Sequence, residues 1–246
     1  VLRTAAYKKT LLENEIIIPA FVEDLGAENG IDYREKNEKK PVIGFAGMVD
    51  LPSKWREIKF QIRMLLMNLQ VKAGLKHKAE TQGLYFRRKL VKVLTGTDKC
   101  ETNFIIRNSF SAHELTMSKD PATLRQEYVD VLKNSDLSLV IRGDGNYSLR
   151  FFEVLSMARA PLFIDTDTPL PFEDEIDYGS FMLRVNYIDL EKLPDIIERF
   201  WNSISNDQFL KMQKQARKVF EEKLRPDAFY KCLFEKLEHQ AEKVTT

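Results

Sequence analysis

The chain has 246 residues, of which 43% are hydrophobic and 30% charged, so it has ample material for a globular core. Lys and Arg number 38 against 37 Asp and Glu. The net charge of +1 argues against a dominant face for polyanions, and nucleic acid is not an expected partner. No run reaches the roughly 18 apolar residues of a membrane span, and no signal peptide opens the chain. We expect a cytoplasmic protein, or one peripheral to a membrane, although a start at Val1 leaves an upstream segment open.

The first forty residues are expected to hold one strand and a charged loop. The apolar run Ile16–Val22 predicts a strand that ends near Pro19. Residues 28–40 are polar and highly charged, with Tyr33 as the one aromatic residue, which is typical of a mobile loop or linker. We therefore place a domain boundary at this segment.

From residue 41 onward, apolar runs of strand length alternate with amphipathic segments of helix length. Strands are expected at residues 42–45, 103–106, 137–141, 162–164 and 181–185. Helices are expected at residues 54–70, 81–94, 121–133, 147–157 and 190–201, with two more in residues 207–242 that are broken at Pro226. This alternation predicts parallel βαβ units in a Rossmann-like α/β sheet, which binds ligands outside the carboxyl ends of its strands.

Two of these helices carry basic residues whose role the sequence leaves open. The apolar face of the first helix consists of Trp55, Ile58, Ile62, Leu65, Leu66 and Leu69. Arg56 and Arg63 lie on the same helix and are usually solvated, but a helix start after a glycine turn is also where phosphate donors would lie. The cluster Arg87–Lys89 on the second helix is most often a solvated face.

The stretch Leu137–Glu153 is predicted to form a strand, a glycine turn and a helix, and it organises the rest of the chain. Gly143 and Gly145 permit positive φ and close backbone approach. The free N–H groups and the positive dipole end of the following helix favour a phosphate. The turn matches neither the dinucleotide fingerprint nor the P-loop, so the two commonest nucleotide motifs are excluded as written.

Side chains around this turn could complete a nucleotide site. Arg142, Ser148 and Arg150 add hydrogen-bond donors for a phosphate. Glu153 lies about one turn further along, where a carboxylate could accept both hydroxyls of a ribose. In the alternative interpretation Ser148 caps the helix, Glu153 pairs with Arg150, and the arginines are solvated.

Other candidate residues also follow predicted strands. Gly47, Arg107, the turn Arg142–Ser148 and the segment Asp165–Thr168 each come directly after one. Because parallel strands end at the same edge of a sheet, these residues are expected to converge there. This convergence favours a binding site at the carboxyl edge.

The residues Arg142-Gly-Asp-Gly-Asn-Tyr-Ser-Leu-Arg-Phe-Phe-Glu153, followed by 161–172, resemble the donor-binding half of exostosin-like glycosyltransferases of the compact bacterial or viral type. The likeness is strong over Asn103–Leu193 and weaker over Pro41–Arg63. It implies the GT-B architecture, with residues 41–204 as the nucleotide-sugar-binding Rossmann-like domain. Residues 1–40 would be a remnant of the N-terminal acceptor part with its linker, and residues 205–246 C-terminal helices. Three alternatives stay open for the acceptor side: upstream sequence is missing, the N-terminal domain is reduced, or the terminal helices build that side.

The resemblance also implies an activity. Members of the exostosin-like family invert the anomeric centre in a single displacement. The expected reaction moves a hexosyl or pentosyl group from a nucleotide-sugar, by default a UDP-sugar, to a hydroxyl of a glycan or glycoconjugate acceptor. Cationic and backbone donors must stabilise the leaving diphosphate. The expected donor-binding residues are Gly47, Arg107, Arg142, Gly143, Gly145, Asn146, Ser148, Arg150 and Glu153.

The general base is the least determined residue. Asp50 is our candidate because it follows the glycine turn after the first strand of the donor domain. Glu23, Asp24 and His113 compete with it, and Asp144 is a weaker contender.

Asp165-Thr166-Asp167 looks like the Asp-x-Asp metal signature of the other major glycosyltransferase fold. Carboxylates two residues apart at a strand end need not converge, and Pro169-Leu-Pro171 reads as a rigid turn. Cys100 and Cys232 lie far apart and form no metal-ligand cluster with the three histidines. We therefore expect a metal-independent enzyme without a cofactor.

Two other classes compete with the transferase. One is a nonenzymatic nucleotide- or carbohydrate-binding module derived from a glycosyltransferase. The other is a nucleotide-dependent oxidoreductase on a similar sheet, which the missing dinucleotide fingerprint disfavours.

Overall fold

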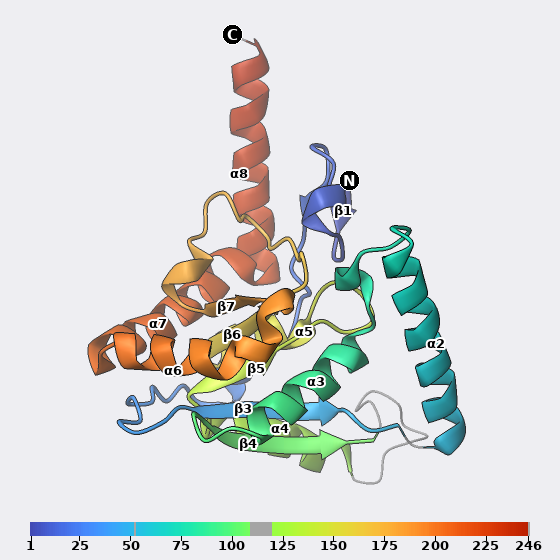
Figure 1. Ribbon diagram of the computed structural model, residues 1–246. Coiled ribbons are helices and arrows are strands. Elements are labelled where there is room, and N and C mark those ends of the chain that lie inside the picture. The colour runs from blue at the N-terminus through green and yellow to red at the C-terminus, as the bar shows by residue number, and fades with distance from the viewer. Residues whose placement is uncertain (52, 109–119, 246) are drawn as a thin grey trace.

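A parallel five-stranded sheet organises the part of the chain that the computed structural model describes, residues 1–51, 53–108 and 120–245 (Figure 1). In sheet order its strands are β4 (Glu101–Arg107), β3 (Val42–Met48), β5 (Leu137–Val140), β6 (Ala160–Asp165) and β7 (Leu183–Asn186). Every neighbouring pair runs parallel. The predicted Rossmann-like α/β class is confirmed.

Helices cover both faces of this sheet (Figure 1). On one face α3 (Gly83–Thr95) packs against α6 (Leu193–Ser203), and on the other lie α4 (Pro121–Lys133) and α5 (Leu149–Ser156), with α7 (Asn206–Val219) against α5. The outer helices are α1 (Leu25–Asn29), α2 (Lys54–Lys72) and α8 (Pro226–Thr245), the last preceded by a π-helical turn at Phe220–Leu224. Short 3-10 turns lie at Lys8–Thr10, Lys78–Glu80, Tyr178–Ser180 and Tyr187–Lys192.

The core is centred on β5 and β6. All four residues of β5 and the first five of β6 are buried, as expected of apolar strands covered on both faces. Phe151 of α5 packs edge-on against Phe163 of β6, with ring centroids 5.3 Å apart. Trp201 of α6 is fully buried and satisfies its indole N–H on the carbonyl of Asn37 at 2.8 Å.

The order of the strands defines where a ligand can bind. β3 is the first strand of this sheet along the chain, β4 pairs on one side of it, and β5 pairs on the other. The connections therefore run in opposite directions from β3 and β5, which leaves a crevice between their carboxyl ends. Open α/β sheets bind ligands at such topological switch points.

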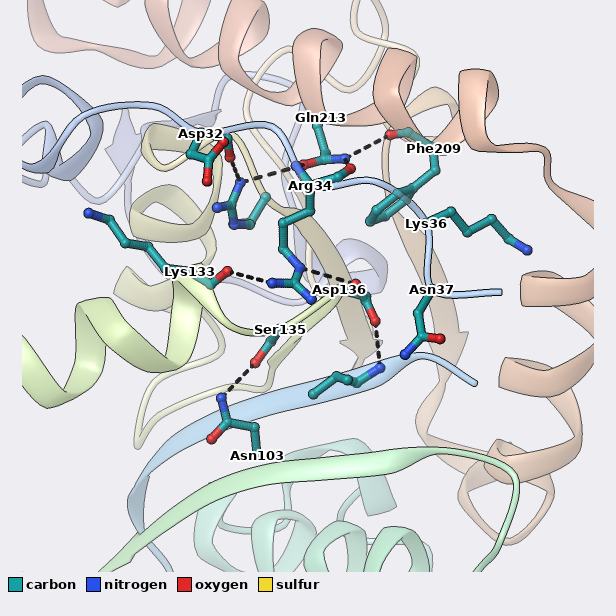
Figure 2. A network of polar contacts seen from close by, with 12 residues as sticks. Asp32, Arg34, Lys36, Asn37, Asn103, Lys133, Ser135, Asp136, Phe209 and Gln213 are labelled. Atoms are coloured by element: carbon teal, nitrogen blue, oxygen red, sulfur yellow. Dashed lines mark hydrogen bonds and ion pairs between the residues drawn. The ribbon is translucent and has the colours of Figure 1, made fainter. Parts of the chain in front are cut away.

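The charged segment before β3 is anchored by hydrogen bonds at the amino edge of the sheet, which differs from the mobile loop expected for residues 28–40 (Figure 2). Arg34 pairs with the fully buried carboxylate of Asp136 at 3.1 Å, and its backbone exchanges hydrogen bonds with Gln213 at 2.9 and 2.8 Å. Asp136 also accepts from the N–H of Val42 at 2.8 Å. The polar composition of this segment therefore reflects contacts with α7 and the sheet.

Two further elements differ from expectation. The strand predicted over residues 16–22 is reduced to β2 (Ile16–Ile17), which pairs only with β1 (Leu2–Arg3) and lies outside the main sheet. The predicted apolar face of α2 is exposed, and the buried residues of that helix are Phe60, Met64 and Met67. Among the described residues, no helix has the length and apolarity needed to cross a bilayer.

Candidate functional site

The switch point brings the glycine turn after β5 next to the start of α3. Gly83 opens α3 so close to this turn that a Cβ there would clash with the carbonyl oxygens of Arg142 and Gly143. Gly143 and Gly145 do not use the positive φ that glycine permits, and the close backbone approach at this turn occurs at Gly83. Gly47 makes room for the guanidinium of Arg150, which lies 2.9 Å from where a Cβ would be.

Two of the predicted donor ligands hold the turn in place. Arg142 is buried and donates to the hydroxyl of Tyr7 at 2.7 Å, to the carbonyl of Ala79 at 2.8 Å and to the carbonyl of Asp144 at 2.9 Å. Asn146 is also buried, and its amide nitrogen donates to the carbonyls of Ala6, Thr166 and Asp167. Both side chains are thus engaged by the protein, which favours a positioning role for them.

Arg150 and Glu153 are linked through Tyr128 of α4. The Arg150 guanidinium lies over the rings of Phe45 at 4.7 Å and Tyr128 at 5.7 Å, and donates to the carbonyl of Ala46. The Tyr128 hydroxyl donates to Glu153 at 2.9 Å. Burial, followed by the nearby Glu153 carboxylate, raises the pKa of Tyr128 well above its usual value. Tyr128 therefore stays protonated and fixes the Glu153 carboxylate about one turn into α5. The side chain of Ser148 makes no hydrogen bond to the first turn of α5, so the simple cap interpretation does not hold.

A cavity of about 480 Å³ lies at this switch point. It is lined by Met48, Leu51, Arg56, Lys59, Phe60, Arg63, Gln82, Leu84, Arg87 and Asp144. Four of these side chains are cationic and one is anionic, so the lining carries an excess of positive charge. Its volume falls within the range of about 300 to 1,000 Å³ that is common for small-molecule sites.

Arg87 adds a second guanidinium close to that of Arg150 at the turn. It donates to the carbonyl of Arg142 at 3.3 Å. Burial and the charge of Arg150 lower the pKa of Arg87 to about 10, while Asp144 opposes the shift. A bound anion would relieve this repulsion, because an opposite charge favours the ionised form of a buried group. The cavity therefore fits a ligand that carries phosphate groups.

Arg107 and Asp50 lie at the carboxyl edge as predicted, with different side-chain environments. Arg107 ends β4 and turns toward α4, where it pairs with Glu127 at 3.2 Å and donates to the carbonyl of Leu124 at 3.0 Å. Asp50 is exposed, and its backbone N–H donates to the carbonyl of Arg107 at 3.3 Å. Of these two, Asp50 presents its side chain to solvent at the edge.

The competing base candidates lie elsewhere. Asp24 caps α1 and pairs with Arg217 at 2.6 Å, and the same guanidinium contacts Ser156 at the end of α5. Burial raises the pKa of Asp24, but Arg217 outweighs this effect and brings the pKa below its usual value. Because α5 starts at the carboxyl edge and runs to the opposite one, Asp24 lies far from the switch point. Glu23 pairs with Arg125 at 2.5 Å. His113 falls outside the described residues.

The Asp-x-Asp segment forms a turn. One carboxylate oxygen of Asp165 pairs with Arg184 at 2.8 Å, and the other accepts from the N–H of Thr168 at 2.9 Å. Asp167 has a positive φ of 63° and contributes its carbonyl to the N–H of Lys8 at 3.0 Å. No group of three His, Cys, Asp or Glu side chains that could hold a metal occurs within the described ranges.

Sequence reasoning missed several contributors to the site. Arg87 lies in a cluster that the sequence predicts to be solvated, and Lys59, Gly83 and Tyr128 are absent from the residues expected at the site. Their positions depend on how α2, α3 and α4 pack around the turn. The one usable signal was the Gly that opens the helix predicted at 81–94, since glycine at a helix start permits close approach of another backbone.

The sheet order and the cationic cavity at its switch point are those of an α/β protein whose fold binds ligands at the carboxyl edge of the sheet. The exostosin GT47 domain matches residues 12–200, which is most of the chain. The chain therefore belongs to the exostosin-like glycosyltransferase family.

The similarity to known proteins covers only part of the length of each of them. The exostosin-1 homolog of Caenorhabditis elegans is 29% identical over 123 residues, 48% of this chain and 31% of that protein. Exostosin-1 of Drosophila melanogaster is 30% identical over 97 residues, 39% of this chain and 12% of that protein. The chain thus spans less than a third of the length of these relatives. The crystal structure of TarM has a TM-score of 0.45 and 14% identity, covering 90% of this chain and 39% of that one.

Proposed function

We propose that this chain is the donor-binding part of an inverting GT-B glycosyltransferase that moves a sugar from a UDP-sugar to a hydroxyl of a glycan acceptor. The observation that carries the proposal is the cationic cavity at the β3/β5 switch point of a chain that belongs to a glycosyltransferase family. Whether the transferred group is a hexosyl or a pentosyl unit depends on contacts to the sugar, which no motif fixes.

The diphosphate would bind where cations gather around the glycine turn. Arg56, Lys59 and Arg63 of α2 line the cavity together with Arg87 of α3. Charge-assisted hydrogen bonds from such groups stabilise the negative charge that grows on the leaving diphosphate. The N-terminal amides of α5 and the guanidinium of Arg150 add donors on the other side of the turn. This assignment adds α2 and α3 to the ligands expected from sequence.

Carboxylates would bind the ribose and deprotonate the acceptor. Glu153, oriented by Tyr128, has acceptor oxygens suited to the two ribose hydroxyls. Asp50, exposed at the end of β3, would deprotonate the acceptor hydroxyl as the diphosphate departs. Asp144 lines the cavity and is the second candidate for this role.

Calorimetry with UDP tests the donor site. Replacement of Arg87 by Gln, Arg150 by Gln or Glu153 by Gln should each weaken binding by roughly 1.5 to 3 kcal/mol, the range for hydrogen bonds to charged groups. Arg199→Gln is the matched control, because Arg199 is an exposed cation on α6. Unchanged affinity in all three variants, measured on folded protein, would remove the donor site from the switch point.

Release of free nucleotide distinguishes an enzyme from a binding module. The protein is incubated with a panel of UDP- and GDP-sugars, with and without acceptor glycans, and the free nucleotide is quantified. A transferase releases it from one donor in preference to the others. Tight binding without release from any donor would favour the nonenzymatic module.

A further inference from the structure

The face of α2 that points away from the protein is apolar. Its six large apolar side chains are between 47% and 67% exposed, namely Trp55, Ile58, Ile62, Leu65, Leu66 and Leu69. At 100° per residue they fall within a stripe about 100° wide along the whole helix. Apolar side chains scattered singly on a surface are ordinary, but a continuous row of six on one helix indicates an interaction surface.

The opposite face of α2 holds the helix on the protein. Phe60, Met64 and Met67 are buried in a small cluster against residues of α3. Glu57 also makes a bidentate ion pair with Arg88 of α3 at 2.8 and 2.7 Å. These contacts fix the rotation of the helix, so the stripe defined above faces outward. Figure 1 shows α2 at the edge of the molecule, beside α3.

The charges around the stripe have one dominant sign. The cations of α2 are Lys54, Arg56, Lys59, Arg63 and Lys72, and its only acid is Glu57. Helical geometry places Lys54 and Lys72 along one border of the stripe and Lys59 along the other. All three lysines are exposed, so their ammonium groups can extend past the apolar side chains toward anions.

We propose that α2 docks on the surface of an anionic lipid bilayer, with the stripe inserted at the boundary between headgroups and acyl chains. Trp and Leu side chains on one face with lysines along its borders are the pattern of an interfacial helix. The lysines would contact anionic headgroups while Trp55 lies at the interface. A second copy of the chain fits this face less well, because the two cationic helices would repel each other.

This docking has a consequence for the cavity at the switch point. Arg56, Lys59 and Arg63 of α2 also line that cavity. A helix with its side chains is only about 10 to 12 Å across, so the cavity would lie within about that distance of the headgroups. The inference goes beyond the proposed transferase activity and is tested without it.

Trp55 provides a direct readout of docking. The chain has two tryptophans, and Trp201 is fully buried, so vesicle-induced changes in emission report on Trp55. With vesicles containing about 30% phosphatidylserine we expect flotation of the protein and a blue shift of the emission. Both should weaken strongly in about 0.5 M salt, because the charges involved are exposed. Wild-type protein that neither floats nor shifts would overturn the proposal.

Variants separate the apolar and the cationic contributions. Ile62→Ser/Leu66→Ser should abolish the blue shift, whereas Leu12→Ser/Ile188→Ser removes two equally exposed side chains elsewhere and should not. Lys54→Gln/Lys72→Gln should weaken binding roughly 25-fold, at about fivefold per lysine near an anionic surface. Its control is Lys192→Gln/Lys218→Gln, which removes two exposed lysines from other helices.

Two further outcomes would contradict the proposal. Equal vesicle binding by the stripe variant and its control would place the contact elsewhere on the protein. A dimer in sedimentation velocity that the stripe variant abolishes, without flotation of the wild type, would assign this face to a second copy of the chain. Circular dichroism of each variant verifies that α2 is still folded.

Discussion

The side chain of Asn146 joins three segments of the chain. Its amide nitrogen donates to Ala6 at 2.8 Å and to the carbonyls of Thr166 and Asp167 at 3.2 Å, and its oxygen accepts from the hydroxyls of Thr166 and Thr168. Because most of these groups are buried, Asn146→Ala would leave several without a partner, at a cost of about 1 to 3 kcal/mol for each unsatisfied group. We expect a loss of at least about 3 kcal/mol in the free energy of unfolding, measured in urea.

Asn68→Ala provides the control for that measurement, since Asn68 is exposed on α2 and should change stability by less than about 0.5 kcal/mol. A stable Asn146 variant with weakened UDP binding would instead return Asn146 to the donor ligands expected from sequence.

Asp50 is exposed at the end of β3, where its carboxylate can meet an acceptor. Asp50→Asn removes the carboxylate that we propose as the base but keeps the size and polarity of the side chain. UDP should bind as before, while product formation falls at least about a hundredfold, the usual scale for a general base. Both quantities are measured on one preparation. A nearly active Asp50 variant combined with an inactive Asp144→Asn variant would transfer the role to Asp144.

At the residue scale, the sequence located the turn but not the partners of its side chains. The apolar run before Arg142 and the pair of glycines were enough to place a strand, a turn and a helix. Arg87, by contrast, lies in a run of basic residues that looks solvated. Only the packing of α3 against the turn, allowed by Gly83, buries its guanidinium next to the carbonyl of Arg142. Such contacts join residues far apart in sequence, which periodicity does not report.

The ion pair between Glu57 of α2 and Arg88 of α3 responds to acid. Hydrogen bonds from Arg88, and then from Gln61, lower the pKa of Glu57 to about 2. A carboxylate whose pKa is lower in the folded state stabilises the fold at a pH above its pKa in the unfolded state, about 4.5. This stabilisation disappears as the pH falls through the pKa of the folded state. We therefore expect Glu57→Gln to be less stable than the wild type at pH 7, with the difference shrinking from about pH 4.5 toward pH 2.

Urea unfolding at a series of pH values measures this difference. Glu222→Gln is the control, because Glu222 is exposed and its ion pair with Lys218 is long, at 4.0 Å. The effect of Glu57 is moderated by solvent screening, since that side chain is more than one-third exposed. A difference that is constant with pH would show that Glu57 acts through helix propensity and not through its charge.

At the element scale, the sequence predicted α2 but not its orientation. Apolar side chains occupy two opposite faces of this helix, Phe60 and Met67 on one and Ile62 and Leu66 on the other. A hydrophobic pattern shows that a helix is amphipathic, yet it does not decide between two apolar faces. The buried cluster and the ion pair of Glu57, both against α3, settle the rotation, and a contact between two helices is not visible in either one alone.

For the whole molecule, the first forty residues contact the sheet at both of its edges. Tyr7 and Ala6 bond to Arg142 and Asn146 at the carboxyl edge, while Arg34 pairs with Asp136 at the amino edge (Figure 2). Polar residues of the kind that suggest a mobile linker make these contacts with the folded protein. The boundary placed at residue 40 stays a prediction.

The charge balance of the whole site bears on whether catalysis needs a metal. A leaving diphosphate requires positive charge, which a divalent cation or a set of basic side chains can supply. Among the described residues, the cavity at the switch point is lined by the cations Arg56, Lys59, Arg63 and Arg87 and by one acid, Asp144. Both carboxylate oxygens of Asp165 are already engaged, by Arg184 and by the N–H of Thr168.

We therefore predict that transfer from the preferred donor proceeds unchanged in EDTA, because the cations of the cavity supply the charge. Turnover is followed with and without chelator, and Mn²⁺ is then added back. Arg63→Gln should lower turnover under both conditions, whereas Arg199→Gln, on an exposed part of α6, should not. Activity that EDTA abolishes and Mn²⁺ restores would contradict the arginine-based mechanism, and would make Asp165 and Asp167 the first residues to test as metal ligands.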